Sequence, residues 1–313
     1  MRALVTGCAG FIGSHLCEYL AEKGYEIIGI DNLSTGSKKN IACLPKKSFR
    51  FVNADIVNAN KMQRIKGRID EIYNLASPAS PLHYQKLSIE TMLANSIGVK
   101  NMLDLARRKN ASFLHASTSE VYGNPLVHPQ SESYFGNVNP VGPRACYDES
   151  KRFAEALIMN YHWRYGMRTR IARIFNTYGP KMSKDDGRVI PNFIIQALQN
   201  KPLTVYGKGL QTRSFCYVSD MVEGLYKLMH CDYSLPVNLG NSNEIKVIEL
   251  AKMIIKITNS KSKIVYKEMP KDDPEKRRPD ISLAKKLLKW KPRVTLKNGL
   301  KKTVIWFSKE VYC

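Results

Sequence analysis

A chain of 313 residues, 43% of them hydrophobic, can bury a sizeable core and form one large domain or two smaller ones. It contains no apolar run of about eighteen residues and no basic segment followed by an apolar stretch, so we expect a cytoplasmic protein without membrane anchor or signal peptide. The seven cysteines are scattered and never spaced as CxxC, which argues against a disulfide framework or a zinc site.

The formal net charge of +22 at pH 7 is the unusual bulk property of the chain. Such a charge could attract a polyanion such as nucleic acid. The lysines, however, are spread over many segments, including Lys38-Lys39, Lys46-Lys47 and Lys285-Lys286, and are not interleaved with aromatic residues in one tract. We interpret the charge as a solvated lysine-rich surface and keep attraction of an acidic small molecule, or incidental nucleic-acid binding, as alternatives.

The first thirty residues follow a pattern typical of a dinucleotide site. A predicted strand, Arg2 to Thr6, is followed by GCAGFIG (residues 7–13) and by a predicted helix from Ser14 to Lys23. Glycines at positions 7, 10 and 13 permit a tight turn, close approach of the backbone to a pyrophosphate, and close packing of the helix on the strand. Spaced glycines alone are a weak signal, so the next strand decides the interpretation.

The second predicted strand, Glu26 to Ile30, ends in Asp31. A carboxylate at this position would hydrogen-bond the adenosine ribose hydroxyls and would repel a 2′-phosphate. Asp31 could also be an ordinary turn residue, but together with the glycine pattern it predicts binding of NAD and not of NADP.

Strands and helices then alternate at the spacing of a doubly wound parallel sheet, which predicts an α/β fold. The predicted strands are Phe49 to Asn53, Glu71 to Leu75, Ser112 to Ala116 and Thr169 to Ile174, and the predicted helices are Ile89 to Arg108 and Tyr147 to Gly166. Ligands bind outside the carboxyl ends of such strands. We therefore expect a site at the loops Asp55-Ile56, LASPASP (75–81) and STSEVYG (117–123).

Beyond Phe175 the pattern changes, and a second region is expected. Its predicted elements are the helices Pro191 to Asn200, Asp220 to His230 with Ser219 as its cap, and Lys246 to Thr258, and the strands Leu203 to Tyr206, Arg213 to Val218 and Pro236 to Leu239. The charged, proline-broken segment from Lys271 to Asp280 is predicted to be a solvent-facing loop, with Arg277 as the exception considered for the site.

The segment CYDESKRF (146–153) contains the pair around which a catalytic site could form. On a helix, Tyr147 and Lys151 lie four residues apart on one face. A positive charge a few ångströms from a phenol favours the phenolate, so Lys151 would make Tyr147 a usable base near neutral pH. A YxxxK spacing alone is more often an ordinary pair on a solvated helix, and its weight here comes from the dinucleotide pattern.

Further segments accompany this pair along the chain: GCAGFIGSHL, DNLSTG, LASPASP, STSEVYG, HPQSE, NPVGPRACYDESKR, ARIFNTYGP, DGRV, LTVYG, QTRSF and KRRPD. With them the chain resembles the extended short-chain dehydrogenase/reductase family over nearly its whole length, and most closely the UDP-glucuronate decarboxylases of that family. The resemblance implies a Rossmann domain at 1–175 and a smaller mixed α/β substrate domain at 176–313, with 213–240 partly returning to the first. It also implies a homodimer that pairs the helices around 92–108 and 147–166.

The same resemblance implies which residues act on the substrate and which hold NAD. The implied catalytic residues are Thr118, Ser119, Glu120, Tyr147, Lys151 and Arg277. The implied cofactor contacts are Gly7, Gly10, Phe11, Ile12, Gly13, Asp31, Asn32, Ser34, Thr35, Gly36, Asp55, Ile56, Leu75, Ser77, Asn95, Ser117, Tyr147, Lys151, Thr177 and Arg188. The implied contacts of the UDP-sugar are Pro78, Thr118, Glu120, Tyr147, Asn176, Arg188, Asn192, Val205, Tyr206, Gln211, Arg213 and Arg277, and no metal is implied.

The implied reaction converts UDP-glucuronate to UDP-xylose. Tyr147, beside Thr118, would take the proton of the 4′-hydroxyl while NAD⁺ takes the hydride, which places the C5 carboxylate β to a ketone. Such an acid loses carbon dioxide readily, and protonation at C5 followed by return of the hydride leaves no net redox change. Glu120 and Arg277 are implied for proton handling at C5 and for the carboxylate or the intermediate.

Ser119 separates this reaction from a related one. A 4,6-dehydratase of the superfamily typically carries an acid there to protonate the departing 6-hydroxyl, which a serine does poorly. Another nucleotide-sugar epimerase or dehydratase stays an alternative, as does a non-catalytic dinucleotide-sensing or nucleic-acid-binding protein. Two departures from the family stand out: Leu93-Ala94-Asn95 replaces a frequent Lys-Thr-Asn, and Lys289 replaces a helix-ending glycine.

Overall fold

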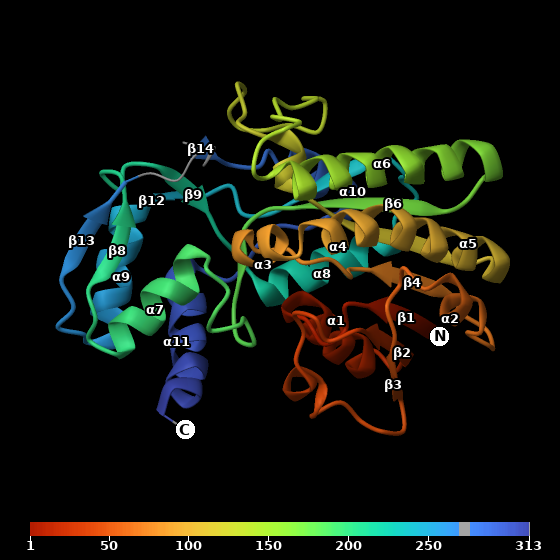
Figure 1. The fold of residues 1–313 in the computed structure, drawn as a ribbon, viewed down its shortest axis with the longest axis horizontal. Coiled ribbons are helices and arrows are strands. Elements are labelled where there is room, and N and C mark those ends of the chain that lie inside the picture. Colours follow the sequence, from red (N-terminus) through yellow and green to blue (C-terminus); the bar gives the residue numbers. More distant parts are fainter. Residues whose placement is uncertain (269–275, 313) are drawn as a thin grey trace.

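The computed structural model describes residues 1–268 and 276–312, so the Lys271–Glu275 part of the predicted charged loop lies outside the described residues. Its centre is a seven-stranded sheet with parallel neighbours in the order β11-β6-β5-β4-β1-β2-β3 (Figure 1). The strands are β1 (Arg2–Thr6), β2 (Glu26–Asp31), β3 (Phe49–Asn53), β4 (Glu71–Asn74), β5 (Ser112–Thr118), β6 (Thr169–Ile174) and β11 (Pro236–Leu239). The order confirms the doubly wound fold, and its direction reverses between β1 and β4, where such sheets hold ligands.

Helices cover both faces of this sheet because successive strand side chains point to opposite sides. Within β1, Leu4 packs into one buried cluster and Val5 into the other. The Leu4 side is covered by α5 (Val99–Lys109) and α6 (Ala145–Tyr165), and the Val5 side by α1 (Phe11–Glu22) and α8 (Val218–Met229). The short helices α2 (Ala59–Gln63), α3 (Pro81–Lys86) and α4 (Ser88–Leu93) occupy the connections between β3 and β5.

The second region lies beside the carboxyl ends of the sheet strands, at the left of Figure 1. Its helices are α7 (Val189–Leu198), α9 (Val247–Thr258) and α11 (Leu296–Tyr312), while α10 (Ser282–Leu288) packs against α8 and β11. Its small sheets pair β8 (Leu203–Tyr206) with β13 (Ile264–Lys267), β9 (Thr212–Ser214) with β12 (Glu244–Lys246) and β14 (Lys276–Arg277), and β7 (Thr177–Tyr178) with β10 (Cys216–Tyr217). The division into two domains after residue 175 stays a prediction.

The long helix predicted from Ile89 to Arg108 is interrupted. A π-helical turn at Ala94–Gly98 separates α4 from α5. Asn95 lies in this turn, and its side-chain amide donates to the hydroxyls of Ser77 (3.1 Å) and Ser150 (3.0 Å). π-turns of this kind occur frequently at functional sites. The turn joins the loop after β4 to helix α6.

The strand predicted from Arg213 to Val218 is wrong in extent. The segment divides at Phe215, because β9 pairs with β12 and β14 whereas β10 pairs with β7. Helix α8 then begins at Val218, with Tyr217 in the N-cap position, so Ser219 lies inside the helix and is not its cap. The change of partner between the two halves is a tertiary effect that local propensity does not encode.

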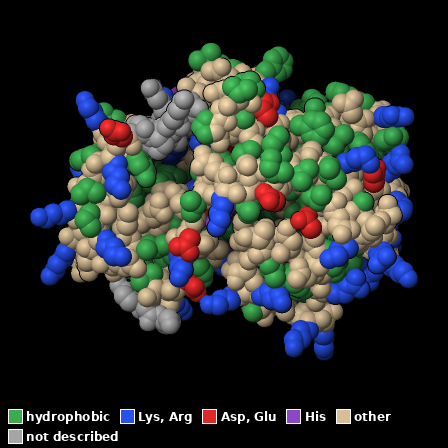
Figure 2. Space-filling view, viewed as in Figure 1, with side chains coloured by type: hydrophobic (Ala, Val, Ile, Leu, Met, Phe, Trp, Pro, Cys, Tyr) green, Lys and Arg blue, Asp and Glu red, His purple; other side chains and the backbone are tan. Residues whose placement is uncertain are grey.

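Helix hydrophobicity, the state of the cysteines and the surface charge bear on where the protein works. None of the described helices is long and apolar enough to cross a membrane, and the cytoplasmic location stays a prediction. The six cysteines within the described residues are free thiols. Figure 2 shows Lys and Arg side chains distributed around the visible face and not gathered into one tract, which agrees with a solvated basic surface.

Lys289 ends α10 in the left-handed conformation, with φ 47° and ψ 40°. A Cβ atom is crowded by its own backbone in this region, whereas glycine has no such clash. We expect Lys289→Gly to raise the free energy of unfolding by up to about 1 kcal/mol, measured by urea denaturation. Lys289→Ala keeps the Cβ and is the matched control. An equal gain in both variants would contradict the strain explanation.

Candidate active site

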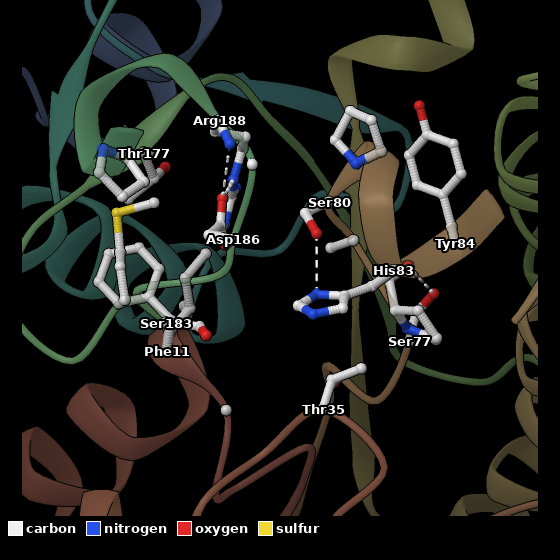
Figure 3. Close-up of a pocket in the computed structure, with 18 of the residues that line it drawn as sticks. Phe11, Thr35, Ser77, Ser80, His83, Tyr84, Thr177, Ser183, Asp186 and Arg188 are labelled. Carbon is white, nitrogen blue, oxygen red and sulfur yellow. Dashed lines mark hydrogen bonds and ion pairs between the residues drawn. The ribbon is translucent and has the colours of Figure 1, made fainter. Parts of the chain in front are cut away.

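A cleft of about 1120 Å³ opens at the carboxyl ends of the central strands and extends to the second region. Ligand pockets commonly measure roughly 300–1,000 Å³, so this cleft has room for a dinucleotide and a second ligand. Figure 3 shows its two walls: Asp186 and Arg188 lie on one side, and Ser80, His83 and Tyr84 of the α3 region lie on the other.

The turn between β1 and α1 leaves no room for a side chain at Gly7 or at Gly13. Gly7 has a φ of +69°, and a Cβ atom on Gly13 would lie 2.0 Å from the carbonyl oxygen of Gly7. Phe11 and Ile12, at the amino end of α1, line the cleft. Because backbone N–H groups at a helix amino terminus favour a phosphate, this turn fits the pyrophosphate of a dinucleotide.

Asp31 stands at the end of β2 as a fixed carboxylate. Its Oδ2 accepts a hydrogen bond from the N–H of Ala9 (3.0 Å), and its Oδ1 accepts one from the N–H of Leu33 (2.8 Å). Burial raises the pKa of Asp31, and the two N–H donors oppose that shift. Asp31 lines the cleft beside the glycine turn, where it fits the ribose hydroxyls of NAD.

Tyr147 and Lys151 lie one turn apart on α6, line the cleft, and are only 6% and 2% exposed. Lys151 Nζ lies 5.9 Å from the centre of the Tyr147 ring and donates to the carbonyl oxygen of Ala116 at 2.7 Å. Thr118, at the end of β5, lies close enough to Tyr147 to lower the pKa of its phenol as a hydrogen-bonding neighbour. The structure therefore brings together the tyrosine, lysine and threonine that the sequence places in the site.

The electrostatics of this pair differ from the expectation. Burial raises the pKa of Tyr147 to about 12, although the hydrogen bond with Thr118 lowers it. Burial lowers the pKa of Lys151 to about 7, although the charge of Glu155 raises it. Because each charged form is costly in a buried position, both side chains are biased toward neutrality. Lys151 can therefore favour the phenolate of Tyr147 only if a neighbouring group keeps the Lys151 amine protonated.

Tyr84 of α3 is a site residue that the sequence analysis missed. Its ring is stacked on Tyr147, with centroids 4.8 Å apart and an interplanar angle of 3°. Its side chain is 1% exposed and lines the cleft, and its hydroxyl has no hydrogen-bond partner among the described residues. The sequence signal was only its position three residues after LASPASP. The stacking fixes the plane of the Tyr147 ring from the side of α3.

Arg277 of β14 is buried, in agreement with its treatment as the exception within a segment predicted to face solvent. Its NH1 donates to the carbonyl oxygen of Ser119 at 2.5 Å and its NH2 to that of Gly123 at 2.8 Å. The same guanidinium forms an ion pair with Glu120 Oε1 at 3.1 Å. Arg277 therefore clamps the turn after β5 as well as its carboxylate.

Arg144, which precedes α6, is a second cation on Glu120: its NH2 contacts Oε2, and its Nε lies 3.8 Å from Asp148 Oδ2. Burial raises the pKa of Glu120, but Arg277, Arg144 and Arg213 outweigh burial and lower it to about 2. Burial and the charge of Glu120 raise the pKa of Asp148 to about 7. Glu120 is therefore an ionised carboxylate at neutral pH, a weak base that is suited to accepting hydrogen bonds.

Arg188 provides a further positive charge in the wall of the cleft. Its Nε and NH2 lie 2.5 Å and 2.7 Å from the carboxylate oxygens of Asp186 (Figure 3). Burial lowers the pKa of Arg188, but the charge and the hydrogen bond of Asp186, together with the charge of Tyr147, outweigh burial and raise it. The side chain thus stays cationic where an anionic ligand would enter.

Most other residues expected from the sequence also line the cleft: Gly10, Asn32, Ser34, Thr35, Asp55, Ile56, Leu75, Ser77, Pro78, Ser117, Asn176, Thr177, Asn192, Tyr206, Gln211 and Arg213. Gly36, Asn95 and Val205 do not line it. A Cβ on Gly36 would lie 3.0 Å from Asp31 Oδ1, Asn95 bonds Ser77 and Ser150, and Val205 belongs to the core. A direct ligand contact stays a prediction for these three and for the residues that line the cleft.

Comparison with known proteins shows what the chain is similar to. A family model described as GDP-mannose 4,6 dehydratase matches residues 4–303. UDP-glucuronic acid decarboxylase 1 of Xenopus tropicalis is 50% identical over 99% of this chain and 73% of that protein. The crystal structure of UDP-glucose 4-epimerase from Thermotoga maritima with UDP-glucose has a TM-score of 0.92 at 30% identity, over 99% of both chains. That of UDP-glucuronic acid 4-epimerase from Bacillus cereus with UDP-glucuronic acid and NAD has 0.87 at 29%, over 99% of this chain and 100% of that one.

The position of Asp31 predicts a preference between dinucleotides. We expect NAD to bind at least about tenfold more tightly than NADP, because a 2′-phosphate would meet a fixed carboxylate, and tenfold corresponds to about 1.4 kcal/mol. The two dissociation constants are measured by isothermal titration calorimetry. Asp31→Asn removes the charge at nearly constant shape and should narrow the preference. Equal affinities in the unsubstituted protein would contradict the role of Asp31.

Proposed function

This chain belongs to the family of the UDP-glucuronic acid decarboxylases, and we propose that it converts UDP-glucuronate to UDP-xylose and carbon dioxide with NAD as a retained cofactor. The observation that carries the proposal is the position of Tyr147 and Thr118 beside a turn, Ser119-Glu120, that Arg277 clamps. A base for an alcohol next to a cationic cluster suits a sugar whose hydroxyl and carboxylate occupy neighbouring carbons.

The first part of the proposed reaction takes place at the 4′-hydroxyl. The glycine turn, Asp31 and Lys151 would hold NAD, which when bound accepts a hydride from C4′ and later returns it. Tyr147 takes the hydroxyl proton, and Thr118 offers a second hydrogen bond to the same oxygen. A cationic Lys151 assists this step because its charge favours the phenolate.

The second part takes place at C5. Once C4′ is a ketone, the carboxylate is that of a β-keto acid: the bond to carbon dioxide breaks and its electron pair moves to the ketone oxygen as an enolate. Tyr147 and Thr118 are placed to stabilise that oxyanion by hydrogen bonds. C5 then needs a proton. Because the arginines keep Glu120 ionised, it is better suited to orienting a proton-donating water than to donating a proton itself.

Ser119 favours decarboxylation over dehydration. Elimination of a 6-hydroxyl needs an acid that protonates the leaving oxygen, and a serine hydroxyl is a poor acid. Ser119 is 3% exposed and its carbonyl oxygen is bound by Arg277, so the residue is held in the turn beside the reacting centre. Loss of carbon dioxide requires no such acid.

We further propose that the chain works as a homodimer paired through α4, the π-turn and α6. Met92, Ile97, Phe153 and Trp163 are 44%, 45%, 52% and 68% exposed on these elements. Figure 2 shows hydrophobic side chains gathered across this part of the visible face. Apolar patches of this kind commonly mark an interaction surface, and one of these elements, α6, also carries Tyr147 and Lys151.

The proposed activity is tested by incubating the purified protein with UDP-glucuronate and NAD⁺. Carbon dioxide and UDP-xylose should form in equal amounts, without accumulation of free NADH, as followed by mass spectrometry and trapped carbon dioxide. Formation of UDP-galacturonate without carbon dioxide would identify a 4-epimerase instead. No turnover of any nucleotide sugar, despite tight binding of NAD, would favour a dinucleotide sensor.

Two variants separate the two halves of the reaction. Tyr147→Phe deletes one hydroxyl and should reduce both cofactor reduction and UDP-xylose formation by roughly 10² to 10⁴, the usual contribution of a general base. Glu120→Gln should slow carbon dioxide release at least about tenfold while a single turnover still reduces the cofactor. Rapid mixing with absorbance detection measures cofactor reduction in both variants, and mass spectrometry and trapped carbon dioxide measure the products. If the two variants lost cofactor reduction to the same extent, the separation would be refuted.

A further inference from the structure

Glu155 is a buried acid that the proposed chemistry does not use. It follows Lys151 by four residues on α6, as Lys151 follows Tyr147, so the three side chains form one row along the helix. Glu155 is 8% exposed and Lys151 only 2%. A buried carboxylate is costly unless it is paired or hydrogen-bonded, so its position needs a reason.

The carboxylate of Glu155 is held by side chains of β5 and β6. Ser117 of β5 donates its hydroxyl hydrogen to Oε1 at 2.5 Å. Arg173 of β6 donates to Oε1 through Nε at 3.0 Å and to Oε2 through NH2 at 2.7 Å. Arg173 is itself anchored, because its NH1 donates to the hydroxyl of Tyr122 at 3.0 Å. Glu155 is therefore held in place by its bonds to Ser117 and Arg173.

The charged and titratable groups around Lys151 come from three elements. Tyr147 and Glu155 lie on α6, His115 lies on β5, and Arg173 lies on β6 behind Glu155. Burial keeps His115 neutral by lowering its pKa well below the usual value. Burial likewise lowers the pKa of Lys151, and the charge of Glu155 is what acts in the opposite direction.

We propose that Glu155 is a positioning residue of the reaction, whose carboxylate supplies the counter-charge that keeps Lys151 cationic beside Tyr147. The inference rests on the role of Lys151 in the proposed function. It extends the Tyr-Lys pair to a row of three residues, in which Ser117 and Arg173 orient the last. The alternative is a purely structural role, in which Glu155 only neutralises Arg173 and holds β6 against α6.

Two substitutions of Glu155 distinguish these roles because they have opposite effects on charge and on shape. Glu155→Gln keeps the length of the side chain and removes its charge, whereas Glu155→Asp keeps the charge and shortens the side chain, which weakens the contacts with Ser117 and Arg173. The first readout is the pH at which the Lys151 amine becomes half-reactive toward trace acetic anhydride, measured by mass spectrometry. The second is the alkaline limb of kcat/KM.

In Glu155→Gln we expect the labelling midpoint and the alkaline limb to move to lower pH by about one unit or more, because a nearby opposite charge commonly shifts a pKa by about 1–3 units. In Glu155→Asp both should stay close to the values of the unsubstituted protein, although the variant unfolds more easily. If Glu155→Gln left both pH values unchanged, or if Glu155→Asp moved them equally, Glu155 would be structural and the proposal overturned.

Glu155→Gln leaves Arg173 buried without its carboxylate and could prevent folding. The double substitution Glu155→Gln/Arg173→Gln removes both charges, and it should still lower the labelling midpoint because the charge of Glu155, and not that of Arg173, raises the pKa of Lys151. An unchanged or higher midpoint would overturn the proposal. Labelling requires no turnover, so a lowered midpoint in a protein that forms no UDP-xylose would support Glu155 and count against the proposed function.

Discussion

The proposed chemistry depends on the positive charge of Lys151, although burial favours the neutral form of its amine. Lys151 is almost fully buried between α6 and β5, and burial lowers its pKa to about 7 and raises that of Tyr147 to about 12. Exclusion of water strengthens every electrostatic interaction in the site, but it also penalises the charge that does the work. Three neighbouring groups act against these effects of burial. Ala116 accepts a hydrogen bond from Lys151, Thr118 lowers the pKa of Tyr147, and the charge of Glu155 raises the pKa of Lys151.

At Glu120 the neighbouring charges outweigh the effect of burial. Glu120 is also buried, yet Arg277 and Arg144 outweigh the penalty and keep it ionised. The two ends meet in one turn, since Thr118 faces Tyr147 while Glu120 faces the arginines. A sugar with neighbouring hydroxyl and carboxylate groups could span that turn. Thr118, which is expected to act at the sugar hydroxyl, and Glu120, which is expected to act near the carboxylate, thus lie two residues apart at the end of β5.

The strands and the glycine turn could be predicted because their signals are local. Short runs rich in apolar residues define β1 to β6, and the turn before α1 needs glycine for space and, at Gly7, for a positive φ. The π-turn at Ala94–Gly98, the division at Phe215 and the stacking of Tyr84 on Tyr147 depend on partners distant in sequence, so no local pattern predicted them. The same holds for Arg277: its motif indicated a role by resemblance, but burial and its bonds to the turn required the folded chain.

The account is tested most directly by following the hydrogen at C4′ of the sugar. UDP-glucuronate that carries deuterium at C4′ is incubated with the protein and NAD⁺, and the UDP-xylose formed is analysed by mass spectrometry and NMR. Because one enclosed site is expected to remove this hydrogen and return it, the deuterium should appear at C4′ of UDP-xylose, together with one equivalent of carbon dioxide. UDP-xylose with ordinary hydrogen at C4′, or deuterated NADH released into solution, would contradict the account.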